Sequence, residues 1–148
     1  MIVKILNIVV DVVVRNLGNI KMKILIVEDD KTRIKWFKEE LIGFKVDIVE
    51  TAKLGIALCK SRKYDLIFLD HDLGGEIYVP SENENTGYQV AKEIAKSINE
   101  ETPIVVHSHN PAGAKNIHGV LNQTQLIPYS TLVTIGLSDK IKETFCSK

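Results

Sequence analysis

A chain of 148 residues with 45% hydrophobic and 26% charged side chains has the composition of one globular domain with a substantial core. Its 19 basic and 19 acidic side chains cancel, so no net field points to a membrane or to duplex nucleic acid, although a local basic patch is compatible with this balance. The two cysteines, Cys59 and Cys146, form no CxxC motif, which favours a reducing, cytoplasmic setting.

Residues 1–21 are apolar and β-branched, but charged side chains interrupt them. The segment is too short and too charged for a bilayer span, which needs about 20 mostly apolar residues, and Asp11 argues against a signal peptide. It is either an extra element covering a sheet edge or an upstream extension of a chain whose natural start is Met22. We favour the second, because Met22 directly precedes the first well-formed strand. We therefore expect one domain, over residues 22–148.

The first half of this domain alternates short apolar runs with helical periodicity. The apolar runs predict three buried strands, at Lys23–Val27, Val46–Val49 and Leu66–Asp70. Asp30 can cap the helix after the first strand, and Gly43 ends that helix. Thr51 can cap the helix after the second strand.

A polar loop opens the second half. Residues 73–86 are rich in Gly, Ser, Asn, Glu and Pro, and they exceed the usual strand-to-helix joint of about 2–6 residues. Such a loop is either a lid or binding loop or a disordered insertion. Helical periodicity follows from Tyr88, and the later predicted elements are a strand at Ile104–Val106, a helix starting at Asn110 and Pro111, an apolar segment at Gln125–Tyr129 and a closing helix around Ser138–Cys146.

Alternating strands and helices predict an α/β fold, a five-stranded doubly wound parallel sheet of the flavodoxin-like type with strand order 2-1-3-4-5. In this order the first, third and fourth strands are neighbours, and ligands bind at their carboxyl ends. The side chains expected to meet there are Glu28, Asp29, Asp70, His71, Asp72, His107 and Ser108.

Four motifs resemble the receiver domain of response regulators: ILIVEDD at the first strand, DLIFLD at the third, Ser108 after the fourth and Ile-Pro-Tyr after the fifth. The resemblance covers Met22 to Lys148. It implies that Glu28 and Asp29 help to hold Mg²⁺, that Asp70 accepts a phosphoryl group and that Ser108 contacts the phosphate. Receivers place a lysine before the last proline, whereas this chain has Ile127, which argues against ordinary phosphorelay signalling.

Two further motifs resemble a divergent receiver branch, the cyclic-phosphate processing receiver-like domains. They are Asp-His-Asp-Leu from Asp70 and His-Ser-His-Asn-Pro-Ala-Gly-Ala from His107. The long insertion after Leu73 also departs from an ordinary receiver. The implied activity is hydrolysis or processing of a cyclic phosphate, such as the 2′,3′-cyclic phosphate on cleaved RNA or a cyclic nucleotide. The implied partner is then a small phosphate ester or an RNA end.

The residues themselves offer the parts that opening a cyclic phosphodiester requires: charge neutralisation, a base and an acid. The predicted ligands of Mg²⁺ or Mn²⁺ are the carboxylates of Glu28, Asp29, Asp70 and Asp72. The predicted catalytic residues are His71, His107, Asp70 and Asp72, with the two imidazoles as an acid and base pair. The predicted phosphate-binding residues are Ser108, Asn110 and Gly113, at a helix N-terminus.

Plainer interpretations stay open. Asp29 and Asp70 can be solvated charges at strand ends, and His71 and His107 can be histidines bonded to the backbone. Side chains alternate along a strand, so His107 and His109 point one way and Ser108 the other unless the strand has already ended. We do not expect all three in the site, and His109 is the first that we leave out.

Three functions fit these observations. We favour an enzyme, a metal-dependent phosphoester hydrolase that acts on a cyclic phosphate. The first alternative is a stand-alone receiver phosphorylated on Asp70. The second is a degenerate receiver that only binds a protein partner. A homodimer is compatible with all three.

Overall fold

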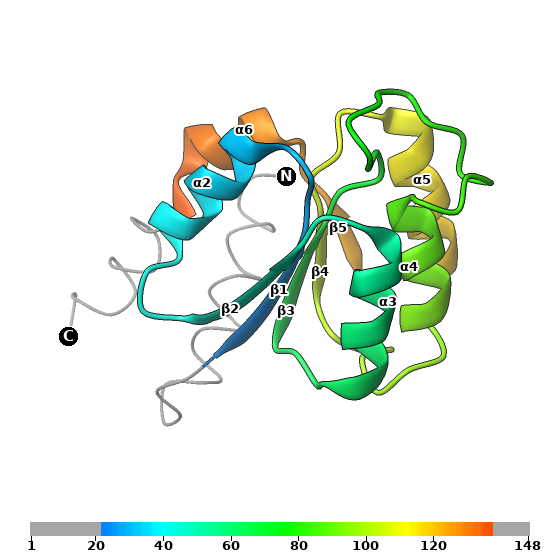
Figure 1. Cartoon of the computed structure of the whole chain (residues 1–148), viewed down its shortest axis with the longest axis horizontal. Coiled ribbons are helices and arrows are strands. Elements are labelled where there is room, and N and C mark those ends of the chain that lie inside the picture. Colours follow the sequence, from blue (N-terminus) through cyan, green and yellow to red (C-terminus); the bar gives the residue numbers. More distant parts are fainter. Residues whose placement is uncertain (1–21, 138–148) are drawn as a thin grey trace.

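Residues 22–137, which the computed structural model describes, form one parallel sheet between two layers of helices (Figure 1). The sheet order is β2-β1-β3-β4-β5, and every neighbouring pair is parallel, as predicted. The strands are β1 (Lys23–Val27), β2 (Lys45–Val49), β3 (Leu66–Leu69), β4 (Ile104–Val106) and β5 (Thr124–Leu126).

Helices cover both faces of the sheet. Figure 1 shows α2 and α6 on one face and α3, α4 and α5 on the other. The helices are α2 (Lys31–Glu40), α3 (Ala52–Ser61), α4 (Gly87–Ile94), α5 (Pro111–Val120) and α6 (Tyr129–Ile135). None of the helices in this described part of the chain is long and apolar enough to cross a membrane.

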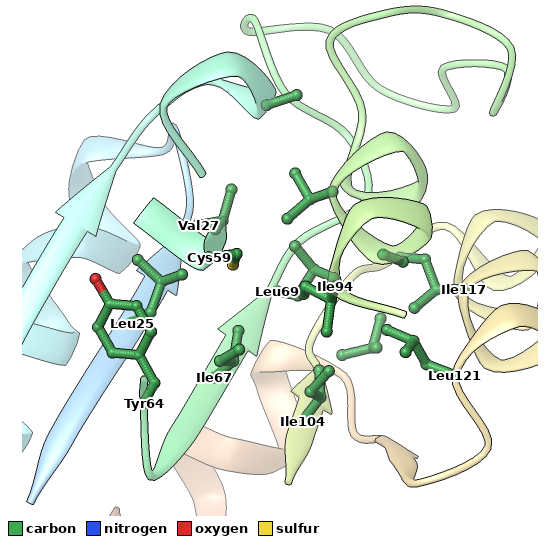
Figure 2. Close-up of a cluster of buried hydrophobic side chains, with 14 of the residues drawn as sticks. Leu25, Val27, Cys59, Tyr64, Ile67, Leu69, Ile94, Ile104, Ile117 and Leu121 are labelled. Carbon is green, nitrogen blue, oxygen red and sulfur yellow. The ribbon is translucent and has the colours of Figure 1, made fainter. Parts of the chain in front are cut away.

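The strands read as continuous apolar runs because alternate side chains enter two different cores. Leu25 and Val27 join the core under α3, α4 and α5, which Figure 2 shows with Ile67 and Leu69 of β3. Ile24 and Ile26, whose side chains point to the other face of the sheet, pack against α2 and α6. Cys59 lies buried in the first of these cores and forms no disulfide with any residue of the described part of the chain. Burial on both sides leaves the strand ends as the place for polar chemistry.

Three predicted helix caps are confirmed. The side chains of Asp30, Thr51 and Asn110 accept hydrogen bonds from backbone N–H groups at the starts of α2, α3 and α5. Pro111 occupies the first turn of α5, where its missing N–H costs no helical hydrogen bond. These caps fix the chain where each helix leaves the carboxyl end of the sheet.

The last strand is shorter than its apolar segment. β5 ends at Leu126, because Pro128 has no N–H to continue the ladder and α6 begins directly after it. Ile127 and Tyr129 still donate their N–H groups to Val106 and His107, so the chain stays hydrogen-bonded to this segment for a few residues past β5. The predicted extension over residues 1–21 and the closing helix at Ser138–Cys146 lie outside the described residues.

Candidate functional site

A cavity of about 410 Å³ lies at the carboxyl end of the sheet. Residues that follow β1, β3 and β4 line it together with the start of α2 and the loop after β3. Its central side chains are Glu28, Asp29, Arg33, Asp70, Ser108 and His109. The predicted meeting of the strand ends is therefore present.

Glu28 follows β1 and is fully buried. Its Oε1 accepts the N–H groups of Asp29 and Asp30 at 3.0 and 2.9 Å, and its Oε2 lies 2.7 Å from Nε2 of His107. Burial raises the pKa of this carboxyl, but His107, the Asp30 N–H and Arg33 together hold the pKa below its ordinary value. Glu28 is thus a buried carboxylate with an imidazole partner.

Asp70 follows β3 and is 3% exposed. Its Oδ1 accepts the N–H of His71 at 2.8 Å. Burial, followed by the charge of Glu28, raises the pKa of Asp70 to about 6, although His107, Arg33 and the hydroxyl of Ser108 act in the opposite direction. A cation placed beside this carboxyl would favour its ionised form.

Arg33 supplies a positive charge at this place. Its Nη1 lies 3.5 Å from Oε2 of Glu28 and 3.5 Å from Oδ2 of Asp70, and its guanidinium lies over the ring of Tyr129. Ile127, where receivers have lysine, is buried in the core beside α2 and α6. Sequence reasoning missed Arg33. The signal was its position in the first turn of α2, three residues after the Asp30 cap, since that turn starts at the carboxyl end of β1.

Three buried side chains could hold a metal ion. The ligand atoms of Glu28, Asp70 and His107 lie within 4.8 Å of one another. Nε2 of His107 lies 2.7 Å from Oε2 of Glu28, whereas its buried Nδ1 has no hydrogen-bond partner among residues 22–137. Two carboxylates with one imidazole fit a divalent cation, and the nitrogen ligand suits Mn²⁺ better than Mg²⁺.

Asp29 and Asp72, the other predicted metal ligands, line the cavity but lie outside this group of three. Asp29 accepts the N–H of Gly75. Burial, together with the charges of Glu28 and Asp30, raises its pKa. Asp29 therefore connects the end of β1 to the loop after β3 by a hydrogen bond. Its role as a metal ligand stays a prediction.

His71 directly follows Asp70 and is fully buried. Its Nδ1 is 2.7 Å from Oδ1 of Asp72, and its Nε2 is 2.8 Å from Oγ of Ser81. The ring packs so closely on α5 that a Cβ at Gly113 would collide with it. His71 does not line the cavity, so its catalytic role also stays a prediction.

Asp72 is the centre of a second hydrogen-bonded group. Besides His71, it accepts Nδ2 of Asn110 at 2.9 Å and the backbone N–H of Tyr78 at 2.7 Å. Burial raises the pKa of Asp72, but the bonds from Asn110, His71 and Tyr78 outweigh it and lower the pKa. Asn110 and Gly113, predicted to bind phosphate, face this group and do not line the cavity. Their predicted role is untested.

His107, Ser108 and His109, the three residues after β4, do not alternate in direction as a strand would require. β4 ends at Val106, so strand alternation no longer applies, and Ser108 and His109 both line the cavity. His107 turns inward, with its ring 5.2 Å from that of Phe37. Burial, followed by the charge of Arg33, lowers the pKa of His109, so this imidazole is neutral at pH 7. His109, which sequence reasoning left out first, is the histidine in the cavity.

The loop after β3 folds over the cavity. An antiparallel bridge between Asp72 and Thr86 ties its two ends together. Figure 1 shows this segment above the sheet, beside the start of α5. Gly75, Ile77 and Tyr78 from this loop line the cavity. These contacts favour a binding loop over a disordered insertion.

A parallel sheet of this order, with an acidic pair after β1 and an aspartate after β3, defines a receiver domain of the response-regulator type. Residues 23–123 match the family described as the cyclic-phosphate processing receiver domain, and the chain belongs to this family. A search of curated proteins found no match.

Solved structures of response regulators share the fold. TrrA from Thermotoga maritima, in complex with Mg²⁺ and BeF, is 21% identical, with 83% of this chain and 98% of that chain covered and a TM-score of 0.59. The Mn²⁺-bound form of Rcp1 is 20% identical, with 82% and 90% covered and a TM-score of 0.59. A response regulator from Hahella chejuensis is 25% identical, with 84% and 92% covered and a TM-score of 0.60.

Proposed function

We propose that this receiver domain is a metal-dependent phosphoester hydrolase that opens a cyclic phosphate, such as the 2′,3′-cyclic phosphate of an RNA end or a cyclic nucleotide, in the cytoplasm. The observation that carries the proposal is the buried group of Glu28, Asp70 and His107. An imidazole among these carboxylates, with Ile127 in place of the receiver lysine, suits a resident metal better than a simple phosphoryl acceptor.

The charge of the cavity supports a bound cation. Among the described residues that line it, six carboxylates face one guanidinium. A phosphate anion would be repelled from such a wall unless a cation neutralised part of it. When bound by Glu28, Asp70 and His107, Mn²⁺ or Mg²⁺ would neutralise phosphate oxygens and lower the pKa of a bound water.

The protein supplies the other parts of the reaction. Water attacks phosphorus, one of the two ring P–O bonds breaks, and a phosphomonoester results. The water proton passes to His109, whose neutral imidazole lines the cavity, while the released oxygen takes a proton from solvent. Arg33 and the hydroxyl of Ser108 would hold the non-bridging oxygens. His71, Asp72, Asn110 and Gly113 shape the wall behind them.

The test is a substrate panel with Mn²⁺ or Mg²⁺: 2′,3′-cyclic nucleotides, cyclic-phosphate RNA ends and 3′,5′-cyclic nucleotides. We expect turnover that Asp70→Asn abolishes and that His109→Ala lowers by roughly 10² to 10⁴. Asp65→Asn and His118→Ala are the matched controls, because Asp65 precedes β3 at the other end of the sheet and His118 contacts Thr124. Absence of turnover on every substrate, or full activity of Asp70→Asn, contradicts the proposal.

A second candidate is phosphorylation of Asp70, which is favoured by its place between the acidic pair and Ser108. Incubation with acetyl phosphate and Mg²⁺, followed by intact-mass measurement, separates the two functions. One labile phosphate that is lost in Asp70→Asn supports signalling through a protein partner. A protein that gains no phosphate but hydrolyses a cyclic substrate is an enzyme. A blank in both assays leaves only the degenerate, partner-binding receiver.

A further inference from the structure

The cavity combines its charged floor with an apolar rim. Ile77 and Tyr78, here called the loop lip, line the cavity although they are 79% and 68% exposed. Resting on the proposed function, we propose that the loop lip is a subsite for a nucleobase. The substrate class is then a nucleoside cyclic phosphate, free or at an RNA end, and not an aliphatic cyclic phosphate.

The size of the cavity fits a ligand larger than phosphate. Its volume of about 410 Å³ lies within the range of roughly 300–1,000 Å³ that small-molecule sites occupy. Its carboxylates, Arg33 and Ser108 account for the charged part of a ligand. An exposed tyrosine ring at the rim provides a π-face for a base, which stacking recognises with little regard to sequence.

The backbone of Tyr78 is held in a conformation that its side chain disfavours. Its φ is 55°, and it is the one non-glycine residue with positive φ within residues 22–137. Asp72 accepts the N–H groups of Tyr78 and Val79 at 2.7 and 3.2 Å, and these bonds maintain the strain. Glycine or asparagine would suit this backbone better. Strained residues cluster at binding sites, and the ring is the group that Tyr78 adds at this position compared with glycine.

The loop lip is also fixed relative to Asp70. Asp72, which anchors the lip, is two residues beyond Asp70 and is itself held by His71 and Asn110. The hydrogen bonds of Asp72 therefore fix the position of Tyr78 relative to Asp70, which belongs to the group that could hold a metal ion. A ligand that spans from phosphate to base would contact both.

The position of the loop lip beside the cavity favours a ligand subsite over a surface for docking a protein. The other exposed large hydrophobic side chains of the described region do not line this cavity, and they include Ile42, Leu54, Ile98 and Val133. The loop lip alone combines exposure with a position on the rim. The exposed side chains of Ile77 and Tyr78 are therefore placed to contact a ligand in the cavity.

The experiment compares a nucleoside 2′,3′-cyclic phosphate with glycerol 1,2-cyclic phosphate, with Mn²⁺ present. Tyr78→Gly and Tyr78→Asn delete the ring and suit the positive φ, Tyr78→Phe keeps the ring, and Val133→Ala is the exposed control. We expect the first two variants to raise KM for the nucleoside substrate by roughly tenfold, as loss of one stacking contact would do. KM for glycerol cyclic phosphate should stay unchanged in the first two variants, and Val133→Ala should change neither KM. Tyr78→Phe, which keeps the ring, should raise KM for the nucleoside substrate less than Tyr78→Gly does.

A binding measurement keeps the subsite testable if no substrate turns over. Calorimetry with Mn²⁺ and either 3′-AMP or glycerol phosphate reports affinity without hydrolysis. Tighter binding of 3′-AMP that Tyr78→Gly removes supports the subsite even where the proposed hydrolysis fails. Equal affinity for the two ligands overturns it even where hydrolysis is observed. A protein partner lost on Tyr78→Gly, with nucleotide binding unchanged, also overturns it.

Discussion

Two fully buried histidines flank Asp70, and their surroundings differ. Both ring nitrogens of His71 have partners, Asp72 and Ser81, and its face is sealed against Gly113. In His107, Nε2 is bonded to Glu28, and Nδ1 has no partner within the segment that the structure describes.

The two rings differ in how many of their nitrogens are hydrogen-bonded. Both nitrogens of His71 are engaged, and the ring packs against Gly113 of α5, so a catalytic role of His71 would require one of these bonds to break. A ring that shares Oε2 of Glu28 and lies close to Asp70 can exchange that hydrogen bond for a metal. Burial alone does not tell the two apart, since each side chain is fully buried.

The largest effect should come from breaking the His107 group. In the metal-free protein, His107→Leu leaves Glu28 as a buried carboxylate without its imidazole and should cost about 3–5 kcal/mol of unfolding free energy, measured in urea. Adding Glu28→Gln to this variant should recover much of the loss, because the neutral amide tolerates burial. A single variant as stable as the wild type would show that the pair is not coupled.

The same group predicts a pH dependence. The pKa of Asp70 is raised from 3.8 to about 6 in the folded chain, so the unfolded chain releases this proton at lower pH. The contribution is present below about pH 4 and is lost as pH rises to about 6, by up to about 3 kcal/mol. Urea midpoints in EDTA at pH 4.5 and 6.5 should show this loss in the wild type and not in Asp70→Asn. Equal profiles would refute the assignment.

The close packing of the His71 ring against Gly113 of α5 can be tested by a substitution in that helix. Gly113→Ala forces a methyl group into the ring, and we expect a loss of about 1–3 kcal/mol. Gly119→Ala is the matched control in the same helix, since its Cβ would meet no atom within 4 Å; it should stabilise by up to about 1 kcal/mol. Thermal melting of both variants makes the comparison. Equal melting temperatures would show that the ring yields.

The smallest effect should follow from Ser81→Ala. It removes one partner of His71 and one of Asn116, so a loss of about 1 kcal/mol is expected. The affinity for Mn²⁺, measured by calorimetry, should stay that of the wild type. A weaker metal site in this variant would join the two histidine groups into one unit and remove the distinction between them.

The sheet, its strand order and three helix caps could be predicted because their signals were local and consistent, whereas α6 at Tyr129–Ile135 was not among the predicted elements. Apolar runs gave the strands, and Asp30, Thr51 and Asn110 gave the caps. The meeting of Glu28 and Asp70 followed from strand order alone. The site could not be completed in this way, because the orientation of residues beyond a strand end depends on where the strand stops.

His109 and Arg33 show what was missed. Period-two alternation was applied to residues 107–109, whereas β4 stops at Val106 and frees the backbone to turn both Ser108 and His109 into the cavity. Arg33 was not among the predicted site residues, although the first turn of α2 lies at the same edge as the carboxylates. His109 lies within a quoted motif and Arg33 lies three residues after a predicted cap, but the direction of each side chain depends on where β4 ends and on how α2 is oriented.

The bridge between Asp72 and Thr86 makes the intervening segment an Ω-loop, a compact excursion with paired ends. Closing its ends fixes the entry and exit of the chain independently of what lies between them. The interior of such a loop can change in length and composition without disturbing the sheet. Gly75 and Ser81 of this loop contact Asp29 and His71, so exchange of the segment would alter the rim of the cavity and these contacts while the strands stay in place.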